Sequence, residues 1–406
     1  MSASERCAEG RGVRASSLVG ARPRDAVGRV SSAVRRALAS RVDEGAAAVV
    51  LAVSGGADSL ALGVCAVDVC ARAGLPVLSL TVDHGLREGS GAEAAHVATL
   101  MRSMGAVART VTVDATTRER GDGPEGDARS ARLAALAAVA GDWGREVGAT
   151  RVCVLLGHTM DDQAETVLLG LARGSGAGSL RGMAPEAEAA PEAPVGREGV
   201  QVRWLRPLLG VRRADTKACC AQLGLQWVDD PTNRADGPWR AADGSALRRA
   251  AVREEALPAL AHALGIDPVP ALARSARLMA RDDDALEAEA RGVRARVELG
   301  AAEALGRVGD AVRGRGGDPE AVVPRWCLDG AFLDALALSQ VVPALRDRVV
   351  HGLLVEVSGR GGSVTSRHVA GVVGLVTDWH GQGPLDVPGA CVMRLPGGVV
   401  AVAARP

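Results

Sequence analysis

A glycine pair, an acid and a hydroxyl lie where an apolar, β-rich run gives way to a helix-like run. The stretch is AVVLAVSGGADSLALGV, from Ala48 to Val64. Gly55 and Gly56 allow the backbone to approach a ligand closely and to adopt positive φ. Free N–H groups at the start of the following helix form a cradle for phosphate. The sequence therefore predicts a phosphate-binding turn at this point.

Asp58 decides what kind of phosphate site this is. The turn lacks the GxxxxGK[ST] spacing of the Walker loop and holds no lysine. An acid repels phosphate unless a cation lies between them, so Asp58 indicates a Mg²⁺ site. The alternative is an ordinary glycine turn in which Asp58 interacts favourably with the helix dipole.

A second polar motif, GHTMDDQAET, covers Gly157–Thr166 and follows another strand-like run. Thr159 can cap the following helix together with Asp162, three residues on. His158, Asp162 and Glu165 can share one face of that helix. Acids at a helix start beside a strand end are well placed to hold a metal near phosphates. A cap and a favourable helix dipole would explain Asp162, but not His158 and Glu165 as well.

A third motif, TVDHGLREGS, covers Thr81–Ser90 and ends the next strand-like run along the chain. Asp83 and His84 would then reach the same edge of a sheet as the first two motifs. Without those motifs, a polar turn after a strand would be the simpler interpretation.

The elements that must position these motifs alternate between strand-like and helix-like runs. The expected strands are Ala48–Val53, Pro76–Val82, Val107–Val113 and Arg151–Leu156, and the expected helices are Asp58–Ala73, Ala92–Met104, Asp127–Val147 and Asp161–Ala172. Four such βα alternations predict an α/β fold, a parallel twisted sheet with helices on both faces. We expect a helical segment and a small α+β C-terminal domain to follow.

Composition shifts suggest the domain limits. We expect a disordered extension at 1–24, a catalytic domain at 25–247, a helical domain at 248–311, a linker at 312–321 and an α+β domain at 322–406. Pro185–Gly199 is of low complexity and predicts a surface insertion, and Asn233–Ser245 predicts a mobile segment.

Composition narrows the functional class. The 406 residues are 47% hydrophobic, 24% charged and only 2% aromatic, with a formal net charge of zero. A chain with zero net charge has no overall electrostatic field that would attract nucleic acid, so an RNA contact would need a local patch of positive charge. Eight cysteines form no CxxC pair and are typical of small buried residues in a reducing compartment. We find neither a secretory signal nor an apolar run of about 20 residues, and expect a cytoplasmic protein with no membrane partner.

Several motifs together resemble one family. They are SGGADS, VDHGLR, DARSAR at 127–132, GHTMDDQAET, RGSGAGSLRGM at 173–183, RPLL at 206–209, DDPTN at 229–233 and RRAAVREEALPAL at 248–260. SGGADS is similar to the pyrophosphate loop of the N-type ATP pyrophosphatases, the PP-loop superfamily. Within it, the combination resembles the tRNA(Ile)-lysidine synthetases from about Asp25 to Leu260.

The resemblance implies an ATP-dependent ligase that makes lysidine at the wobble cytidine of tRNA(Ile) with a CAU anticodon. ATP, with Mg²⁺, would adenylate the C2 carbonyl oxygen of that cytidine, and the ε-amine of free L-lysine would then displace AMP. A homodimer is also implied. A tRNA cytidine thiolase would need the CxxC pairs that this chain lacks, and an ammonia-using amidoligase would lack the DHGLR and RGSG context. A non-catalytic nucleotide-binding module would be expected to have lost the acids or the arginines.

Residue roles follow from the motifs and the resemblance together. The expected nucleotide-binding residues are Ser54, Gly55, Gly56, Ala57, Asp58, Ser59, Asp83 and His84, with Asp58 and Asp162 as metal ligands. The expected catalytic residues are Asp58, Arg129, Arg132, His158 and Asp162. The expected tRNA contacts are Arg206, Arg249 and Arg253, with Arg203, Arg212 and Arg213 as further members of the same group.

Two of these roles have a physical basis in the residue types. Arg129 and Arg132 lie three apart on an expected helix, so both guanidinium groups can face the α-phosphate or the cytosine carbonyl. Lysine must attack as the free amine, and deprotonating it at pH 7 costs about 4.6 kcal/mol. His158 is the nearest candidate base, and a metal-neutralising acid is an equal alternative.

Overall fold

The computed structural model describes residues 14–42, 47–83, 85, 89–113, 124–174, 176–187, 199–229, 234–237, 247–359 and 364–405. The chain forms two compact units, Met1–Ala280 and Arg281–Pro406. The division falls within a long helix, α12 (Pro268–Val297). Each unit has a sheet of its own.

A six-stranded sheet forms the centre of the first unit, in the order β3-β2-β1-β4-β6-β5. Its strands are β1 (Ala47–Ala52), β2 (Val77–Asp83), β3 (Val107–Thr112), β4 (Arg151–Leu155), β5 (Glu186–Ala187) and β6 (Gln201–Leu205). All neighbouring pairs are parallel except β5 with β6. The predicted parallel α/β sheet is confirmed, and β5 and β6 extend it beyond the four expected strands.

The strand order reverses at β1, which pairs with β2 on one side and with β4 on the other. Ligands in open α/β sheets bind at such a switch point, beyond the carboxyl ends of the strands. The motifs SGGADS and GHTMDDQAET follow β1 and β4 directly. The topology therefore brings these two motifs to the same edge of the sheet.

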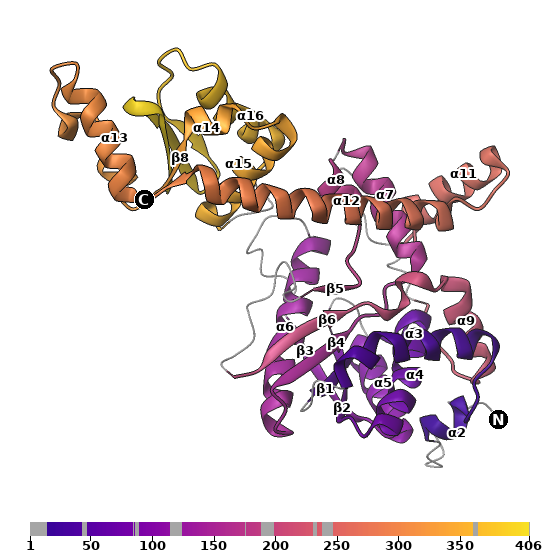
Figure 1. Cartoon of the computed structure of the whole chain (residues 1–406). Coiled ribbons are helices and arrows are strands. Elements are labelled where there is room, and N and C mark those ends of the chain that lie inside the picture. Colours follow the sequence, from indigo (N-terminus) through magenta and orange to yellow (C-terminus); the bar gives the residue numbers. More distant parts are fainter. Residues whose placement is uncertain are drawn as a thin grey trace. The chain divides into compact units, whose positions relative to one another are not determined.

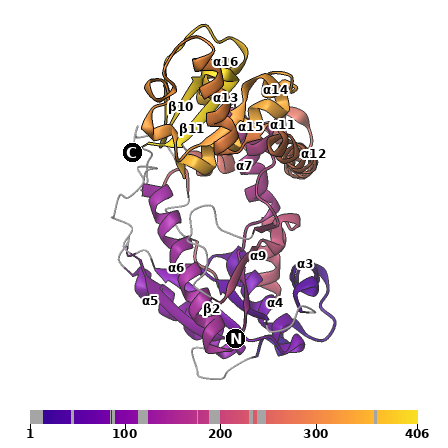
Figure 2. The ribbon, with the colours of Figure 1, turned by 60° about the vertical axis from the view of Figure 1, so that its left-hand side comes forward.

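Side chains of β1 alternate between two layers of helices. Val49 and Leu51 pack with one layer, whereas Ala48 and Val50 pack with the other. The first layer contains α3 (Asp25–Val42), α4 (Ala57–Ala73), α5 (Ser90–Met104) and α9 (Arg213–Gln222). The second contains α6 (Pro124–Glu146), which Figures 1 and 2 show apart from α3, α4 and α9. The expected helices on both faces are confirmed.

Further helices complete the first unit. They are α7 (Met160–Ala172), α8 (Ala177–Leu180), η1 (Pro207–Gly210), α10 (Arg248–Ala251), η3 (Val252–Ala256) and α11 (Leu257–Leu264). A small apolar cluster of Ala164, Leu257 and Val269 joins α7 to α11 and the start of α12. The segment from Arg248 onward is helical, and this cluster holds its beginning against α7.

One short helix lies where the sequence predicts disorder. The range 1–24 contains α2 (Ala15–Val19), whose Ala15 and Val19 are buried in the core of the first unit. The side chain of Arg72 on α4 donates a hydrogen bond to the carbonyl of Gly20, which ends α2. Apolar burial of Ala15 and Val19 therefore outweighs the Arg-, Ser- and Gly-rich composition of the range 1–24, of which residues 1–13 lie outside the described part.

The second unit contains a five-stranded antiparallel sheet in the order β7-β8-β11-β10-β9. Its strands are β7 (Glu298–Leu299), β8 (Ala331–Asp334), β9 (Leu385–Val387), β10 (Ala390–Leu395) and β11 (Val399–Ala404). Its helical elements are α13 (Ala301–Arg313), η4 (Pro319–Ala321), η5 (Arg325–Cys327), α14 (Ala335–Ser339), α15 (Pro343–Ser358), α16 (Ser366–Thr377) and η7 (Pro396–Gly398). The expected small α+β module is confirmed.

This unit begins earlier in the chain than the sequence suggests. We expect a helical domain to end at 311 and a linker to follow, but β7 pairs with β8. Val308 and Val312 of α13 are buried in one cluster with Phe332 and Val399 of the C-terminal sheet. The apolar face of α13 therefore belongs to the second unit, and packing rather than composition sets the division.

Among the described helices, none taken singly is long and apolar enough to cross a membrane. Arg248–Leu264 and Pro268–Val297 meet that test as a pair, by length and composition alone, with a bend of 100° between them.

We predict that Phe332→Ala destabilises the second unit by about 3–5 kcal/mol, because it removes a large buried side chain and leaves a cavity. Phe332 is 1% exposed, whereas Leu336 in the same unit is 71% exposed. Leu336→Ala should therefore change the free energy of unfolding by less than about 0.5 kcal/mol. Urea unfolding measures both variants, and equal effects would contradict the assignment of Phe332 to the core.

Candidate active site

The turn after β1 has the geometry of a phosphate cradle. Gly55 has a φ of 89°, which an L side chain rarely adopts. Gly56 is the N-cap of α4 with a φ of −71°, so the expectation of positive φ is confirmed at Gly55 and wrong at Gly56. Ser59 Oγ accepts a hydrogen bond from the N–H of Ser54 at 3.1 Å and donates one to the carbonyl of Gly56 at 3.0 Å. In the described structure no side chain caps α4, which leaves its first N–H groups for a ligand.

The first two motifs lie in direct contact. A Cβ atom at Gly157 would be 3.2 Å from the N and Cα atoms of Ser59 and 3.3 Å from the carbonyl carbon of Asp58. These are backbone atoms, which cannot move aside as a flexible side chain can. Glycine at 157 therefore allows the turn after β4 to lie against the start of α4.

The start of α7 is a capping box. Thr159 is its N-cap, and the N–H and Oγ1 of Thr159 each donate to Asp162 Oδ2 at 2.7 Å. In return, the N–H of Asp162 donates to Thr159 Oγ1 at 3.4 Å. The predicted cap is confirmed, and it fixes the direction of the Asp162 carboxylate.

Three acids converge on the guanidinium group of Arg213 at the start of α9. Its Nε lies 3.3 Å from Asp58 Oδ2, its Nη2 lies 2.7 Å from Asp162 Oδ1, and its Nη1 lies 3.1 Å from Glu165 Oε1. Thr216 Oγ1 donates a further hydrogen bond to Asp58 Oδ1. We call Asp58, Asp162 and Glu165 the acid cluster.

Burial and neighbouring charges shift the pKa values of Asp58, Asp162 and Arg213. Burial raises the pKa of Asp58, against the lowering effects of Thr216 and Arg213. Burial acts against ionisation of Asp162 as well, but Arg213 and the Thr159 hydrogen bonds lower the pKa of Asp162. Although burial opposes it, the three acids raise the pKa of Arg213, so that this side chain stays charged.

The two predicted metal ligands, Asp58 and Asp162, both accept hydrogen bonds from Arg213 in this arrangement, and their role in binding Mg²⁺ stays a prediction. Both oxygens of Asp58 accept hydrogen bonds, from Thr216 and Arg213. Both oxygens of Asp162 do so too, from Thr159 and Arg213. Two carboxylates suit Mg²⁺ by their chemistry, but the oxygens that face each other here are joined by a guanidinium. Within the described residues, no group of three or more acid, histidine or cysteine side chains could hold a metal ion.

Arg249 and Arg253, both expected to contact tRNA, also reach the acid cluster. Arg253 donates to both carboxylate oxygens of Glu165, from Nε to Oε1 at 2.7 Å and from Nη2 to Oε2 at 3.1 Å. Its Nη2 also lies 3.7 Å from Asp162 Oδ1. Arg249 lies 3.8 Å from Glu165 and donates to the hydroxyl of Thr166 at 3.1 Å. The segment that starts at Arg248 is thus connected to α7 by charge as well as by apolar packing.

A second group of side chains carries positive charge. Arg129 and Arg132 extend from α6, and Arg206 lies 8% exposed at the end of β6. Burial and the charges of Arg129 and Arg249 lower the pKa of Arg132 to about 10. Burial and Arg129 likewise lower the pKa of Arg206. Because the charge of Arg129 acts on both Arg132 and Arg206, these side chains lie near Arg129, and we call the three residues the arginine cluster.

The arginine cluster has hydrogen-bonding capacity to spare. The buried Nε atoms of Arg132 and Arg206 have no partner among the described residues. Arg206 Nη1 donates to the carbonyl of Ala184, which holds the side chain inside the fold rather than at a surface. Buried guanidinium groups with unused donors favour an anionic ligand. Arg206, expected at a surface that contacts tRNA, thus lies with the expected catalytic arginines.

His158 lies near members of both clusters. Burial lowers the pKa of His158 to about 3, with the charges of Arg129, Arg206 and Arg132 in support and the charge of Asp162 in opposition. Its buried Nδ1 has no partner among the described residues. His158 is therefore neutral at physiological pH, and in this arrangement it is a weaker base than the sequence suggests.

The remaining expected residues have other surroundings. Asp83 ends β2 and accepts a hydrogen bond from the N–H of Gly85 at 3.0 Å, whereas His84 lies outside the described residues. Arg203 pairs with Glu186 at 2.8 Å, and Arg212 pairs with Asp161 and Asp267. The grouping of Arg203 and Arg212 with the tRNA contacts gains no support from these ion pairs.

The place of Arg213 among the acids is not predicted by the sequence, and neither Glu165 nor Thr216 is among the expected site residues. A signal for Arg213 is present, because Arg212 and Arg213 lie at the start of a helix, where the dipole disfavours cations. Two adjacent arginines at that position require acids from elsewhere in the fold. The sequence does not say which acids these are.

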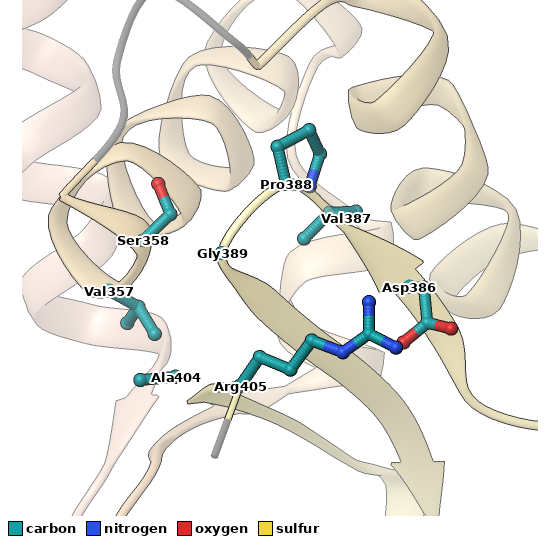
Figure 3. A pocket seen from close by; sticks show the side chains of 8 residues that line it. All are labelled: Val357, Ser358, Asp386, Val387, Pro388, Gly389, Ala404 and Arg405. Atoms are coloured by element: carbon teal, nitrogen blue, oxygen red, sulfur yellow. The ribbon is translucent and has the colours of Figure 1, made fainter. Parts of the chain in front are cut away.

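A cavity of about 660 Å³ lies in the second unit, and Figure 3 shows the side chains around it. It is lined by Val357, Ser358, Asp386, Val387, Pro388, Gly389, Ala404 and Arg405. None of the chemistry-bearing motifs of the sequence contributes to it. The edge of the first sheet, with its two charged clusters, is the stronger candidate for an active site.

Comparisons with known proteins agree with this location. Residues 30–260, just over half of the chain, match the model of the PP-loop domain family. A tRNA(Ile)-lysidine synthase of Leifsonia xyli is 40% identical over 348 residues, which cover 86% of this chain and 87% of the relative. Another from Salinispora tropica is 41% identical over 379 residues, which cover 93% and 96%.

The chain belongs to the tRNA(Ile)-lysidine synthase family. In this lysidine synthase family member, the matched PP-loop domain contains both charged clusters. Among solved structures, the U34-tRNA thiolase NcsA of Methanococcus maripaludis has a TM-score of 0.45 and 17% identity, with 63% of this chain and 80% of the thiolase covered. A similarity of that size supports no conclusion about the site.

We predict that Gly157→Ala weakens ATP use by this family member. The added Cβ would displace the backbone at Ser59, and overpacking of this kind costs about 1–3 kcal/mol. The KM for ATP, measured by pyrophosphate release, should rise. Gly210→Ala is the matched control, because a Cβ there would meet nothing within 4 Å. Equal KM values for wild type and Gly157→Ala would contradict the close contact.

We also predict a pH-dependent loss of stability that His158 causes. The unfolded chain protonates His158 near pH 6.5, whereas the folded chain does so near pH 3, so stability falls as pH drops from 6.5 towards 3. Between pH 7 and pH 5 this amounts to roughly 2 kcal/mol. His158→Gln should remove that part of the slope in urea unfolding, and His96→Gln, at an exposed position, should not. An unchanged slope in His158→Gln would refute the prediction.

Proposed function

We propose that this chain joins free L-lysine to C2 of the wobble cytidine of tRNA(Ile) with a CAU anticodon, with ATP as the activating substrate. The products are lysidine in the tRNA, AMP and diphosphate. The observation that carries the proposal is the contact of Gly157 with Ser59, which brings the PP-loop turn beside the two charged clusters. Its relatives named tRNA(Ile)-lysidine synthase support the same reaction.

The first step forms a bond between the cytidine O2 and the α-phosphorus of ATP and breaks the bond to diphosphate. The leaving diphosphate would lie at the start of α4. Gly55 and Gly56 have no side chains that would block its approach, and the first N–H groups of the helix are not capped by a side chain. The arginine cluster offers unused donors to the α-phosphate and the adenylated base. Donors held in place before charge develops lower the barrier without reorganisation.

The second step forms a bond between the lysine ε-nitrogen and C2, and AMP leaves with the electrons of the C2–O bond. The amine must lose a proton, and His158 is a neutral candidate to accept it. Burial depresses the pKa of His158, and three arginines depress it further. An anionic phosphate beside Arg129 and Arg206 would offset part of their charge and raise that pKa. His158 would therefore become a stronger base when the adenylate is present.

The substrates set further expectations. Mg²⁺ is proposed as the ion that accompanies ATP, and no step of the reaction is assigned to it, because Arg213 joins the oxygens that could ligate it. Asp83 and His84 are proposed to lie near the nucleotide. A cytoplasmic location and a homodimer remain predictions.

The reaction itself is tested by its products. Purified chain, ATP, isotopically labelled lysine and a tRNA(Ile) transcript should yield AMP, diphosphate and a tRNA heavier by one lysine residue at the anticodon, as measured by mass spectrometry. Reactions with ammonia or sulfide in place of lysine distinguish an amidoligase or a thiolase. A tRNA of unchanged mass, with no AMP formed, would refute the proposal and favour a nucleotide-binding module.

Arg249 and Arg253 are proposed to leave Glu165 and to bind tRNA phosphates in its place when tRNA is present. We predict that Arg249→Ala with Arg253→Ala raises the KM for tRNA and lowers the dependence of log KM on log salt concentration by about 1 for each phosphate that is no longer bound. Arg274→Ala, an exposed arginine on α12, is the control. A wild-type tRNA KM and salt slope in the double variant would show that these arginines serve the acid cluster alone.

A further inference from the structure

Arg213 lies where two elements of the candidate site meet. Its three guanidinium nitrogens each contact a different carboxylate, one at the start of α4 and two on α7. We propose that Arg213 is a positioning residue that holds the phosphate-binding turn and the start of α7 at the spacing the reaction needs. The inference rests on the proposed function, because the spacing matters only if both elements act on the same substrates.

The contacts favour this role over that of a surface ion pair. The side chain of Arg213 is 18% exposed, and those of Asp58, Asp162 and Glu165 are 25%, 12% and 0% exposed. A buried acid is tolerated only with charged and hydrogen-bonded partners. Within the described residues, the side chain of Asp58 accepts hydrogen bonds from Thr216 and Arg213. Removal of Arg213 would therefore leave Asp58 with the hydroxyl of Thr216 and without its link to α7.

The shape of the guanidinium group matters as much as its charge. Arginine presents donors in a rigid planar fork, whereas a lysine ammonium is a compact point charge. The three acids come from positions 58, 162 and 165, and a fork can contact all of them at once. Lysine at 213 would keep the charge but could not reach the three carboxylates simultaneously.

The backbone at Arg213 is itself held in place. The N–H of Arg213 donates a hydrogen bond to Asp161 Oδ2 at 2.8 Å. Thr216 Oγ1 donates to the carbonyl of Arg213 as well as to Asp58. The start of α9 is therefore a rigid base from which one side chain extends across to α4 and α7.

The test compares Arg213→Ala and Arg213→Lys with Arg29→Ala. Arg29→Ala removes the ion pair of 2.8 Å between Arg29 of α3 and Asp215 of α9, and it leaves the ion pairs of the acid cluster intact. A misplacement of about 1 Å in a catalytic site can cost about 100-fold in rate. We expect kcat for lysidine formation to fall by about that factor in Arg213→Ala, with a smaller change in the KM for ATP, and to remain low in Arg213→Lys. Arg29→Ala should keep wild-type kcat.

Rescue by free guanidinium chloride at millimolar concentration distinguishes a lost positioning contact from a general loss of folding, which the salt would not reverse. Guanidinium chloride should restore kcat of Arg213→Ala at least tenfold and raise its Tm, whereas equal concentrations of methylammonium chloride should not. Neither salt should do so for wild type or Arg29→Ala. A kcat of Arg213→Ala within threefold of wild type, or a loss that guanidinium does not reverse in either kcat or Tm, would overturn the inference.

The Tm measurement keeps this test separate from the proposed function. If wild type makes no lysidine, the function is wrong, and the guanidinium-dependent Tm of Arg213→Ala still reports whether a guanidinium joins the acids. If wild type is active and Arg213→Lys equals it in kcat, the function stands and the positioning role is wrong.

Discussion

Glu165 is a carboxylate with a side chain that is 0% exposed, and its burial constrains everything around it. A buried charge costs several kcal/mol unless cations and hydrogen-bond donors surround it. Those cations come from distant parts of the chain: Arg213 at the start of α9, and Arg249 and Arg253 from the segment that begins at Arg248. Burial of the Glu165 carboxylate with these partners thus requires that α7, α9 and the segment from Arg248 be assembled together.

His158 lies near groups of both charges. The pKa of His158 responds to Asp162 of the acid cluster and to Arg129, Arg132 and Arg206 of the arginine cluster. A ligase that uses ATP and then accepts an amine must stabilise a phosphate anion and also bind a substrate cation. The arginine cluster favours the anion and the acid cluster favours the cation, and a neutral imidazole near both can move a proton without adding a fixed charge.

The parallel sheet and the local geometry of the two site turns could be predicted from the sequence, because they depend on local patterns. The alternating runs predicted the parallel sheet, Gly55 predicted positive φ, and the spacing of Thr159 and Asp162 predicted the cap. The failures have a common cause. The helix α2, the strands β5 and β6 and the place of α13 depend on partners far away in the chain, and burial against those partners outweighed a polar or ambiguous local composition.

The amino-acid sequence by itself determined which groups could do chemistry and at which strand ends they occur, because turn geometry, capping and βα alternation involve residues within a few positions of one another. The tertiary structure alone decided how those groups are charged and paired. It joined Asp58 and Asp162 through Arg213, and it buried Arg206 near His158. Coulombic pairing and desolvation act between residues that are close in space, and distance along the chain does not reveal them.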